Sequence, residues 1–235
     1  MYILANIHVS VMYVYGYMSH ISFWVAHHFN MFLLQLVMLK KGINYVIKPT
    51  LPNEKPDFIT SKHDGKMPVI VHKGESMSDS MAIAEYLEKS FPHSTLTRQG
   101  AYSYAEILEK TSGFFPALAA FIKNKDASQD ASLQAAVESQ LDTLDELLRS
   151  TPGQYFCGIE LTLADLYLLP QLFHAMVAIE KFKGVEIYKI GSGSPQRPAL
   201  ENYLSRMLDL EEFNNKKAYY NVDQVIYGWK QARGE

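Results

Sequence analysis

Cysteine is almost absent from this chain, whose 235 residues include only Cys157. One cysteine cannot form an internal disulfide. It also excludes a CxxC redox motif and a zinc cluster built from several cysteines. This scarcity is in keeping with a reducing compartment, where proteins seldom carry disulfides.

An excess of positive charge is lacking as well. Lys and Arg number 22 against 25 Asp and Glu, which gives a formal net charge of −3. This balance provides neither the basic footprint of a nucleic-acid-binding protein nor a polybasic signal for anionic lipid. Because 48% of the residues are hydrophobic and 20% are charged, the chain can bury a core, and intrinsic disorder is not expected.

Charged side chains are missing from the whole N-terminal segment, in which Lys40 is the first residue with a charge. A membrane-spanning helix would need about 20 apolar residues, and asparagine, serine and histidine residues interrupt this segment too often. It has neither the basic start of a secretory signal nor the arginines of a transit peptide. We therefore interpret it as a buried strand within 9–17 followed by a buried helix over 29–41.

The pattern up to residue 92 predicts a small α/β domain. Short runs with β-branched residues predict strands over 42–48 and 67–72. A turn at Lys73-Gly74 and a short return strand over 76–78 complete the pattern of a β-hairpin. The polar, proline-containing stretch over 49–66 predicts a loop with room for one short helix. Apolar residues at helical spacing predict a helix over 80–90, which Pro92 ends.

After residue 100 the pattern is helical throughout. Residues 93–100 form the expected linker, and residues 101–235 form the expected second domain. Apolar residues recur at helical spacing over 102–124 and 132–150. Residues 163–183 predict a strongly apolar helix, and residues 199–209 and 222–231 predict shorter ones. The sequence GSGSPQRP at 191–198 predicts a flexible loop within this domain.

Pro68 and the pair Asp79-Ser80 form the first motif with chemical content. Pro68 opens a predicted strand and cannot donate a ladder hydrogen bond, so it belongs on an edge strand or follows a cis peptide bond. The residue before a cis-proline can offer its backbone to an extended peptide ligand. Asp79 and Ser80 begin a predicted helix, where hydroxyl and backbone N–H groups can bind a carboxylate. An edge strand followed by an ordinary N-cap explains the same residues, and spacing alone leaves both interpretations open.

Thr162 and Asp165 mark the second motif, within GIELTLADLYLLP at 158–170. Their spacing is that of a capping box, in which the threonine side chain accepts from the Asp165 N–H and the carboxylate reaches back. Leu161 and Leu166 can close a hydrophobic staple around this box. We assign these residues a folding role rather than a catalytic one.

Together the two motifs resemble the glutathione transferase superfamily over about residues 28–235. The resemblance implies a thioredoxin-like α/β domain over 1–92, in which residues 1–30 are atypical, followed by an all-α domain over 101–235. Further stretches resemble the dehydroascorbate reductases of this superfamily, namely Glu54-Lys55-Pro56, FFPALAAFIKNKDA at 114–127, PQLFHAMVAIEKFKG at 170–184 and Tyr227-Gly228-Trp229. The chloride intracellular channel proteins, a sister family, share LTLADLYLLP.

The resemblance implies glutathione as co-substrate and indicates the residues that would bind it. Lys55 would contact a glutathione carboxylate, and the backbone of Met67 would pair with the cysteinyl part, with Pro68 setting the geometry. Asp79 and Ser80 would hold the γ-glutamyl end. For Lys55, a solvated loop charge is the alternative.

His174 and Trp229 would line the pocket for dehydroascorbate, again by resemblance. Each has a simpler explanation, since His174 can be a hydrogen-bonded histidine on an apolar helix and Trp229 can seal the core. No metal is implied. The expected partners are glutathione and dehydroascorbate, without nucleic acid or membrane. We expect a monomer in the cytoplasm, with the chloroplast as the alternative compartment.

The nucleophile of this family is missing. In the family, a CPF[CS] segment opens the first helix, whose N-terminus lowers the thiol pKa before the thiolate forms a mixed disulfide with glutathione. When the family pattern is aligned at Lys41, the position of CPF[CS] is occupied by His28-Phe29-Asn30-Met31 in this sequence. Imidazole cannot form a mixed disulfide, and Cys157 is expected in the core. Two explanations stay open: a variant that binds glutathione without the reductase step, or residues 1–30 that are not the native N-terminus, as after a wrongly placed exon boundary.

The leading hypothesis is an enzyme that reduces dehydroascorbate to ascorbate with glutathione, impaired by the missing cysteine. The second is a conjugating glutathione transferase, in which Ser22 or a nearby tyrosine would activate the glutathione thiol by a hydrogen bond. The third is a non-enzymatic, channel-like relative that inserts its apolar N-terminus into a membrane.

Overall fold

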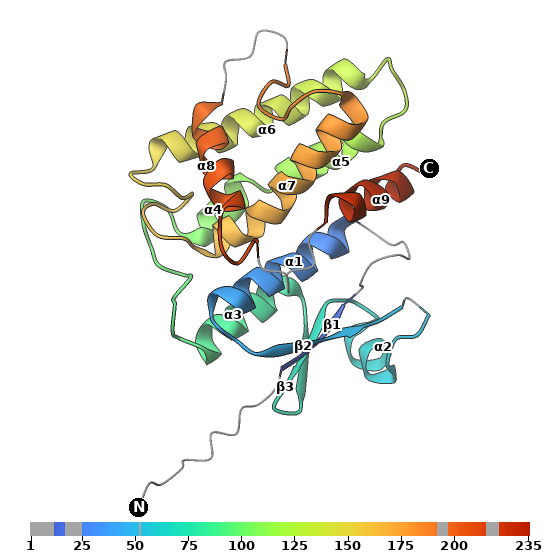
Figure 1. Cartoon of the computed structure of the whole chain (residues 1–235), viewed down its shortest axis with the longest axis vertical. Coiled ribbons are helices and arrows are strands. Elements are labelled where there is room, and N and C mark those ends of the chain that lie inside the picture. The colour runs from blue at the N-terminus through green and yellow to red at the C-terminus, as the bar shows by residue number, and fades with distance from the viewer. Residues whose placement is uncertain (1–11, 17–24, 52, 192–196, 215–220) are drawn as a thin grey trace, which may run out of the picture.

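The computed structural model describes residues 12–16, 25–51, 53–191, 197–214 and 221–235. A small sheet lies at one end of the molecule and a group of helices at the other (Figure 1). Helix α1 (Val25–Lys40) lies between them and contacts both α7 (Leu163–Lys183) and α9 (Val222–Ala232). This arrangement confirms the predicted α/β part followed by an all-α part.

Four strands form one mixed sheet in the order β2-β1-β3-β4. β1 (Met12–Gly16) runs parallel to β2 (Tyr45–Pro49) and antiparallel to β3 (Val69–His72), and β3 pairs antiparallel with β4 (Glu75–Ser78). Helix α1 supplies the crossover that two consecutive parallel strands require. These are the predicted strands, with ends displaced by a few residues.

The side chains of β1 alternate between the two faces of the sheet. Met12 and Val14 are fully buried in a core shared with α1 and α3 (Ser80–Ser90). Tyr15 points to the other face, where its ring meets that of Phe58 edge-on at a centroid distance of 5.3 Å. Phe58 belongs to α2 (Asp57–His63), so α2 covers one face of the sheet and α1 with α3 covers the opposite one.

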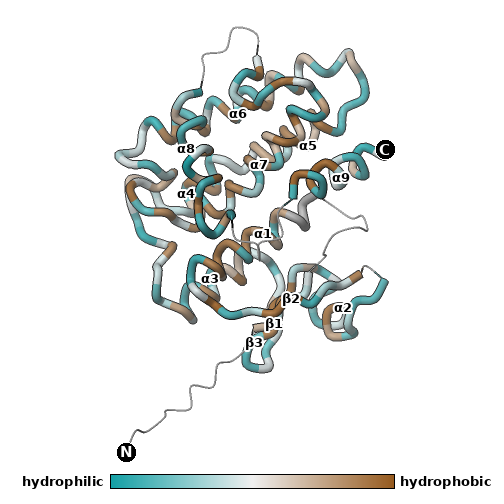
Figure 2. The backbone as a smooth tube through the Cα atoms, in the orientation of Figure 1, coloured by the Kyte–Doolittle hydropathy of each residue, from teal (hydrophilic) through white to brown (hydrophobic). Residues whose placement is uncertain are grey.

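Helix α7 is the centre of the all-α part. The other helices described there are α4 (Tyr104–Lys110), α5 (Phe114–Lys123), α6 (Asp130–Ser150), α8 (Pro198–Leu208) and α9. Most residues of α7 are buried, as expected for a helix that is apolar on nearly every side (Figure 2). Within the described ranges, no helix combines the length and the apolar character needed to cross a membrane.

The prediction of one helix over 102–124 is wrong, because α4 and α5 share this segment. Helix α4 ends at Lys110, the Thr111 hydroxyl donates to the Ile107 carbonyl at 2.7 Å, and α5 begins at Phe114. Pro116 therefore lies in the first turn of α5, where its missing N–H removes no intrahelical hydrogen bond. In a continuous helix the same ring would crowd the carbonyl four residues earlier, and the break before Phe114 removes this conflict at Pro116.

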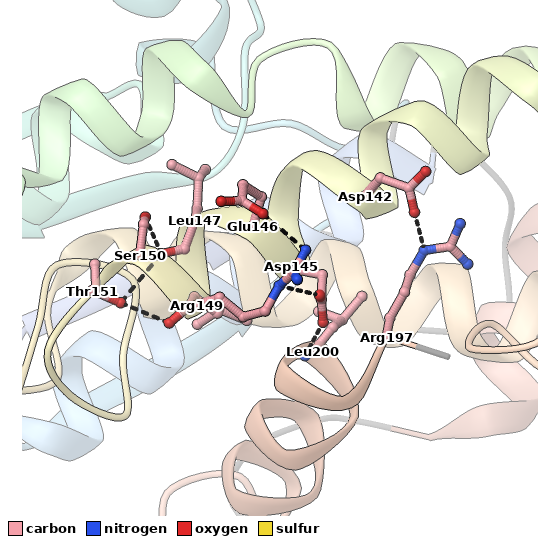
Figure 3. Close-up of polar contacts among 10 residues, drawn as sticks. Asp142, Asp145, Glu146, Leu147, Arg149, Ser150, Thr151, Arg197 and Leu200 are labelled. Atoms are coloured by element: carbon pink, nitrogen blue, oxygen red, sulfur yellow. Dashed lines mark hydrogen bonds and ion pairs between the residues drawn. The ribbon is translucent and has the colours of Figure 1, made fainter. Parts of the chain in front are cut away.

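Carboxylates of α6 fix the start of α8. Arg197 has only 1% of its surface exposed, and its Nε donates to Asp142 Oδ1 at 2.7 Å. The Leu200 N–H donates to Asp145 Oδ1 at 3.0 Å, which satisfies one of the free N–H groups at a helix start (Figure 3). Pro198 suits the first position because it has no N–H to satisfy. The loop predicted over 191–198 lies largely outside the described residues.

The buried carboxylate of Asp165 joins three parts of the all-α region. The Thr162 N–H donates to Oδ2 at 2.8 Å, and the two residues form a capping box at the start of α7. The Phe156 N–H donates to Oδ1 at 3.0 Å, and the Tyr203 hydroxyl of α8 donates to the same oxygen at 3.2 Å. One side chain thus holds the start of α7, the loop before it and α8.

A chain of polar contacts runs from α1 to α7. The Lys41 side chain is fully buried, and its Nζ pairs with Glu88 Oε2 at 2.9 Å and donates to the Phe91 carbonyl at 2.8 Å. The other Glu88 oxygen accepts from the Leu96 N–H at 2.9 Å, and the Leu96 carbonyl accepts from the Leu163 N–H at 2.8 Å. The linker is therefore tied to both parts, and domain limits at residues 92 and 101 stay a prediction.

We expect Asp165→Asn to lower the free energy of unfolding by about 3 kcal/mol or more, because an amide cannot accept from all the buried donors around it. Urea denaturation followed by circular dichroism measures the change. Asp209→Asn, at an exposed carboxylate after α8, is the control and should stay within about 0.5 kcal/mol of the wild type. Equal losses in both variants would contradict the role of Asp165.

Candidate functional site

Lys55 lies in the turn before α2 and is half-buried. Its Nζ donates to the Gly65 carbonyl at 2.7 Å, which holds the turn against the segment that follows α2. Gly65 has a φ of +68°, in the left-handed region that favours glycine. Lys55 is therefore anchored to the protein, unlike the solvated loop charge that was its alternative.

The Met67–Pro68 peptide bond is cis. The strand that follows, β3, lies between β1 and β4 and is therefore not an edge strand. Pro68 was expected either on an edge strand or after a cis peptide bond. The edge-strand explanation is wrong, and the cis bond is present. Met67 is buried, with 5% of its surface exposed.

Asp79 and Ser80 form the turn from β4 into α3. Asp79 has a φ of +73°, and one carboxylate oxygen accepts from the N–H groups of Met81 and Ala82 at 3.0 and 2.9 Å. The hydrogen bonds are those of a side-chain N-cap, but the positive φ differs from the extended backbone that N-cap residues usually adopt. The side chain of Asp79 is exposed, and its second carboxylate oxygen takes no part in these bonds. The Ser80 hydroxyl donates to Asn30 Oδ1 at 3.0 Å, so the start of α3 contacts α1.

The register of the β3–β4 hairpin brings Pro68 and Asp79 together. Val69 pairs with Ser78 across the two strands. Pro68 and Asp79 are the next residues outward on each strand, so the cis bond and the α3 N-cap lie side by side at one end of the hairpin. We call Met67, Pro68, Asp79 and Ser80 the hairpin-end cluster, and we include Lys55 because its Nζ contacts the Gly65 carbonyl, two residues before Met67.

A second group, the aromatic cluster, consists of Phe29, Phe115, His174 and Trp229. The Phe29 ring lies 4.6 Å from Phe115 and 6.4 Å from His174, between centroids. Trp229 of α9 lies 6.4 Å from His174 and 6.2 Å from Phe115. The two residues predicted to line a dehydroascorbate pocket are therefore neighbours, each with 1% of its surface exposed.

Trp229 carries a buried donor with no hydrogen-bond partner among the described residues, its indole Nε1–H. Leaving such a donor unpaired costs about 1–3 kcal/mol. A ligand oxygen beside α9 would satisfy this donor.

The start of α1 lies between the two clusters. Asn30 contacts Ser80 of the hairpin-end cluster, while Phe29, the preceding residue, belongs to the aromatic cluster. His28 comes directly before them in the first turn of α1, and its side chain lies outside what the structure describes. Sequence reasoning missed Asn30 as a site residue, although its position two residues after His28 was the available signal.

Two family models match the chain. That for the glutathione S-transferase N-terminal domain matches residues 11–89, and that for the C-terminal domain matches residues 116–206. The chain belongs to the glutathione transferase superfamily. Since the first match begins at residue 11, the predicted start of the resemblance at residue 28 is too late. The superfamily uses glutathione as co-substrate.

Individual relatives include dehydroascorbate reductases. Glutathione S-transferase DHAR2 of Arabidopsis thaliana is 29% identical over 196 residues, which cover 83% of this chain and 85% of that protein. Probable glutathione S-transferase DHAR1, cytosolic, of Oryza sativa subsp. japonica is also 29% identical, over 83% and 84%. The crystal structure of Chlamydomonas reinhardtii dehydroascorbate reductase matches with a TM-score of 0.75 and 28% identity, over 94% of this chain and 98% of that one. The predicted thioredoxin-like and all-α fold class is confirmed.

Cys157, the only thiol of this glutathione transferase family member, lies away from both clusters. It has 1% of its surface exposed, just before the α7 capping box, and its sulfur is 3.3 Å from the Thr162 hydroxyl. Burial raises the pKa of the Cys157 thiol to about 11. Because the thiolate is the nucleophile, Cys157 cannot serve as a reactive cysteine near neutral pH.

We expect Cys157 in the folded protein to resist iodoacetamide at pH 8, where roughly one thiol in a thousand is ionised if its pKa is about 11. The rate should rise as the pH approaches 11, or at once when urea unfolds the chain. Mass spectrometry of the intact protein counts the adducts. Rapid labelling of the folded protein at pH 8 would show that the thiol is accessible and ionised.

Proposed function

We propose that this chain binds glutathione at the hairpin-end cluster and uses it to reduce dehydroascorbate. The observation that carries the proposal is the position of the α1 start between the hairpin-end and aromatic clusters. A glutathione molecule paired with the Met67 backbone and held by Ser80 would place its sulfur near this helix start. An oxidised ligand beside His174 and Trp229 would then lie on the other side.

Chemical groups in each cluster fit these roles. Lys55 is a cation for a glutathione carboxylate, and the open Asp79 oxygen can accept from the γ-glutamyl ammonium. The unpaired Trp229 N–H is a donor for a carbonyl oxygen of dehydroascorbate. The similarity to dehydroascorbate reductases supports the same substrate pair.

The reaction would draw both of its thiols from glutathione. The first thiol adds to a carbonyl carbon of dehydroascorbate, and its proton passes to the carbonyl oxygen. A second glutathione attacks the bound sulfur and releases glutathione disulfide, while the sugar acid leaves with the electron pair and takes up the proton as ascorbate. Two glutathione molecules are oxidised for each dehydroascorbate reduced. Without a protein thiol to form the intermediate, this route should be slow compared with a cysteine-bearing relative.

Conjugation of glutathione to an electrophile is the second candidate, because it also needs no protein thiol. It would require a hydroxyl close to the glutathione sulfur. Ser22, the residue considered for this role, lies outside the described residues. Conjugation of a simple aromatic electrophile, without turnover of dehydroascorbate, would favour this candidate.

For location, we propose the cytoplasm, with the chloroplast as the alternative. The names of the relatives support both, since Oryza DHAR1 is called cytosolic and Arabidopsis DHAR3 chloroplastic. Insertion of the N-terminus into a membrane is the third candidate function. Binding of the chain to liposomes would support it.

Glutathione binding should depend on Ser80. We expect Ser80→Ala to raise the Kd for glutathione about tenfold, because a hydrogen bond to a charged ligand group contributes about 1.5–3 kcal/mol. Isothermal titration calorimetry measures the change. Ser90→Ala, at the exposed end of α3, is the matched control and should bind like the wild type. Equal Kd values for all three proteins would contradict a site at the hairpin end.

Restoring a cysteine should increase turnover. We expect His28→Cys to raise kcat for dehydroascorbate reduction about tenfold or more, equivalent to about 1.4 kcal/mol of barrier, because a thiol in the first turn of α1 would be activated by the helix N-terminus. Ascorbate formation is followed by its ultraviolet absorbance. His93→Cys places a thiol on the exposed start of the linker and should change nothing. If His28→Cys shows no reduction of dehydroascorbate, the proposed substrate is wrong.

A further inference from the structure

The imidazole of His63 lies between two serine hydroxyls of β4. Its Nε2 is 2.8 Å from Ser76 Oγ, and its Nδ1 is 3.1 Å from Ser78 Oγ. His63 is the last residue of α2, so these contacts join the helix that covers one face of the sheet to the edge strand β4. Ser76 and Ser78 point to the same side because they are two residues apart on a strand.

His63 and its partner Ser78 each connect to a part of the hairpin-end cluster. On one side, the Lys66 N–H donates to the His63 carbonyl at 2.8 Å, and Met67 follows at the cis bond. On the other, Ser78 immediately precedes Asp79 and pairs with Val69. The His63 ring therefore closes a loop of contacts around the end of the β3–β4 hairpin.

We propose that His63 is a positioning residue that fixes the distance between the two backbone segments to which glutathione binds. One segment is the α2–β3 connection that ends at Met67, and the other is the β4–α3 turn at Asp79 and Ser80. This inference rests on the proposed glutathione site. His63 itself would not touch the ligand but would hold the site in its binding geometry before glutathione arrives.

Serine hydroxyls suit this role because each can donate or accept a hydrogen bond. A neutral imidazole donates from one ring nitrogen and accepts at the other, while an imidazolium donates from both. In each case Ser76 and Ser78 can reorient to complete both bonds. The contact is thus a two-sided brace between α2 and β4.

The first test is glutathione affinity. We expect His63→Ala to raise the Kd for glutathione about fivefold, within the range of one or two net hydrogen bonds. His63→Asn keeps an amide near the position of Nδ1 and should restore part of the affinity through Ser78. His93→Ala, at an exposed histidine in the linker, should bind like the wild type.

A double-mutant cycle separates the brace from a general loss of packing. If the two side chains act through one another, His63→Ala combined with Ser78→Ala should bind no more weakly than His63→Ala alone. Fully additive losses in binding free energy would overturn the proposal. So would an unchanged Kd in His63→Ala, provided that the wild type binds glutathione.

The brace can be tested without any ligand. Amide hydrogen exchange over 64–67 and 76–79 should be faster in His63→Ala than in the wild type, whereas exchange in α7 should be unchanged. Unchanged exchange in both segments would overturn the brace even if glutathione does not bind. If the wild type fails to bind glutathione while exchange responds as expected, the proposed function falls and the contact between α2 and β4 remains.

Discussion

The Asp165 carboxylate and the Thr162 hydroxyl form the contact on which the rest of this structure depends. The two groups lie 2.9 Å apart, and the same hydroxyl is 3.3 Å from the sulfur of Cys157. Around this contact, α7 begins, α8 is held through Tyr203, and the loop before α7 is closed through Phe156. The one thiol of the chain, that of Cys157, is thus part of the contacts that fix the start of α7.

Because Cys157 is buried in this folding contact, the candidate site lies elsewhere, at helix α1 between the sheet and the all-α part. This helix shares a core with Met12 and Val14 of the sheet on one side and contacts α7 and α9 on the other, so nearly all of its side chains from Phe29 to Met38 are buried. A helix in such a place cannot carry charge without a partner. Charge appears only at its end, where Lys40 pairs with Glu212 at 3.1 Å and Lys41 pairs with Glu88. For this part of the N-terminal segment, burial explains the absence of charge.

Sequence patterns predicted the parts of the fold that depend on interactions between residues close together in the chain. Alternation and β-branched residues indicated the strands, and Thr162 with Asp165 indicated the start of α7, because a capping box is made within four consecutive residues. The break between α4 and α5 was missed although Pro116 was visible, since the apolar period continued across it. Pro116 marks the point where the helix is interrupted, whereas Pro170 is accommodated inside the continuous helix α7.

The contacts that build the site could not be predicted in the same way. Asn30 contacts Ser80 and His63 contacts Ser78 across long stretches of chain, and only the sheet register and the packing of α1 bring these pairs together. The family resemblance indicated Lys55, Pro68, Ser80, His174 and Trp229 as residues of interest. It did not indicate that the start of α1 joins one cluster to the other.

The central claim is that the chain binds glutathione but offers it no thiol. Two mass spectra of the wild-type protein test the two halves: a native spectrum after incubation with glutathione, and an acidic, denaturing spectrum after incubation of the folded protein with glutathione disulfide. We predict a complex in the native spectrum and the unmodified chain in the denaturing one. A glutathione adduct that survives denaturation, or the absence of any native complex, would contradict the account.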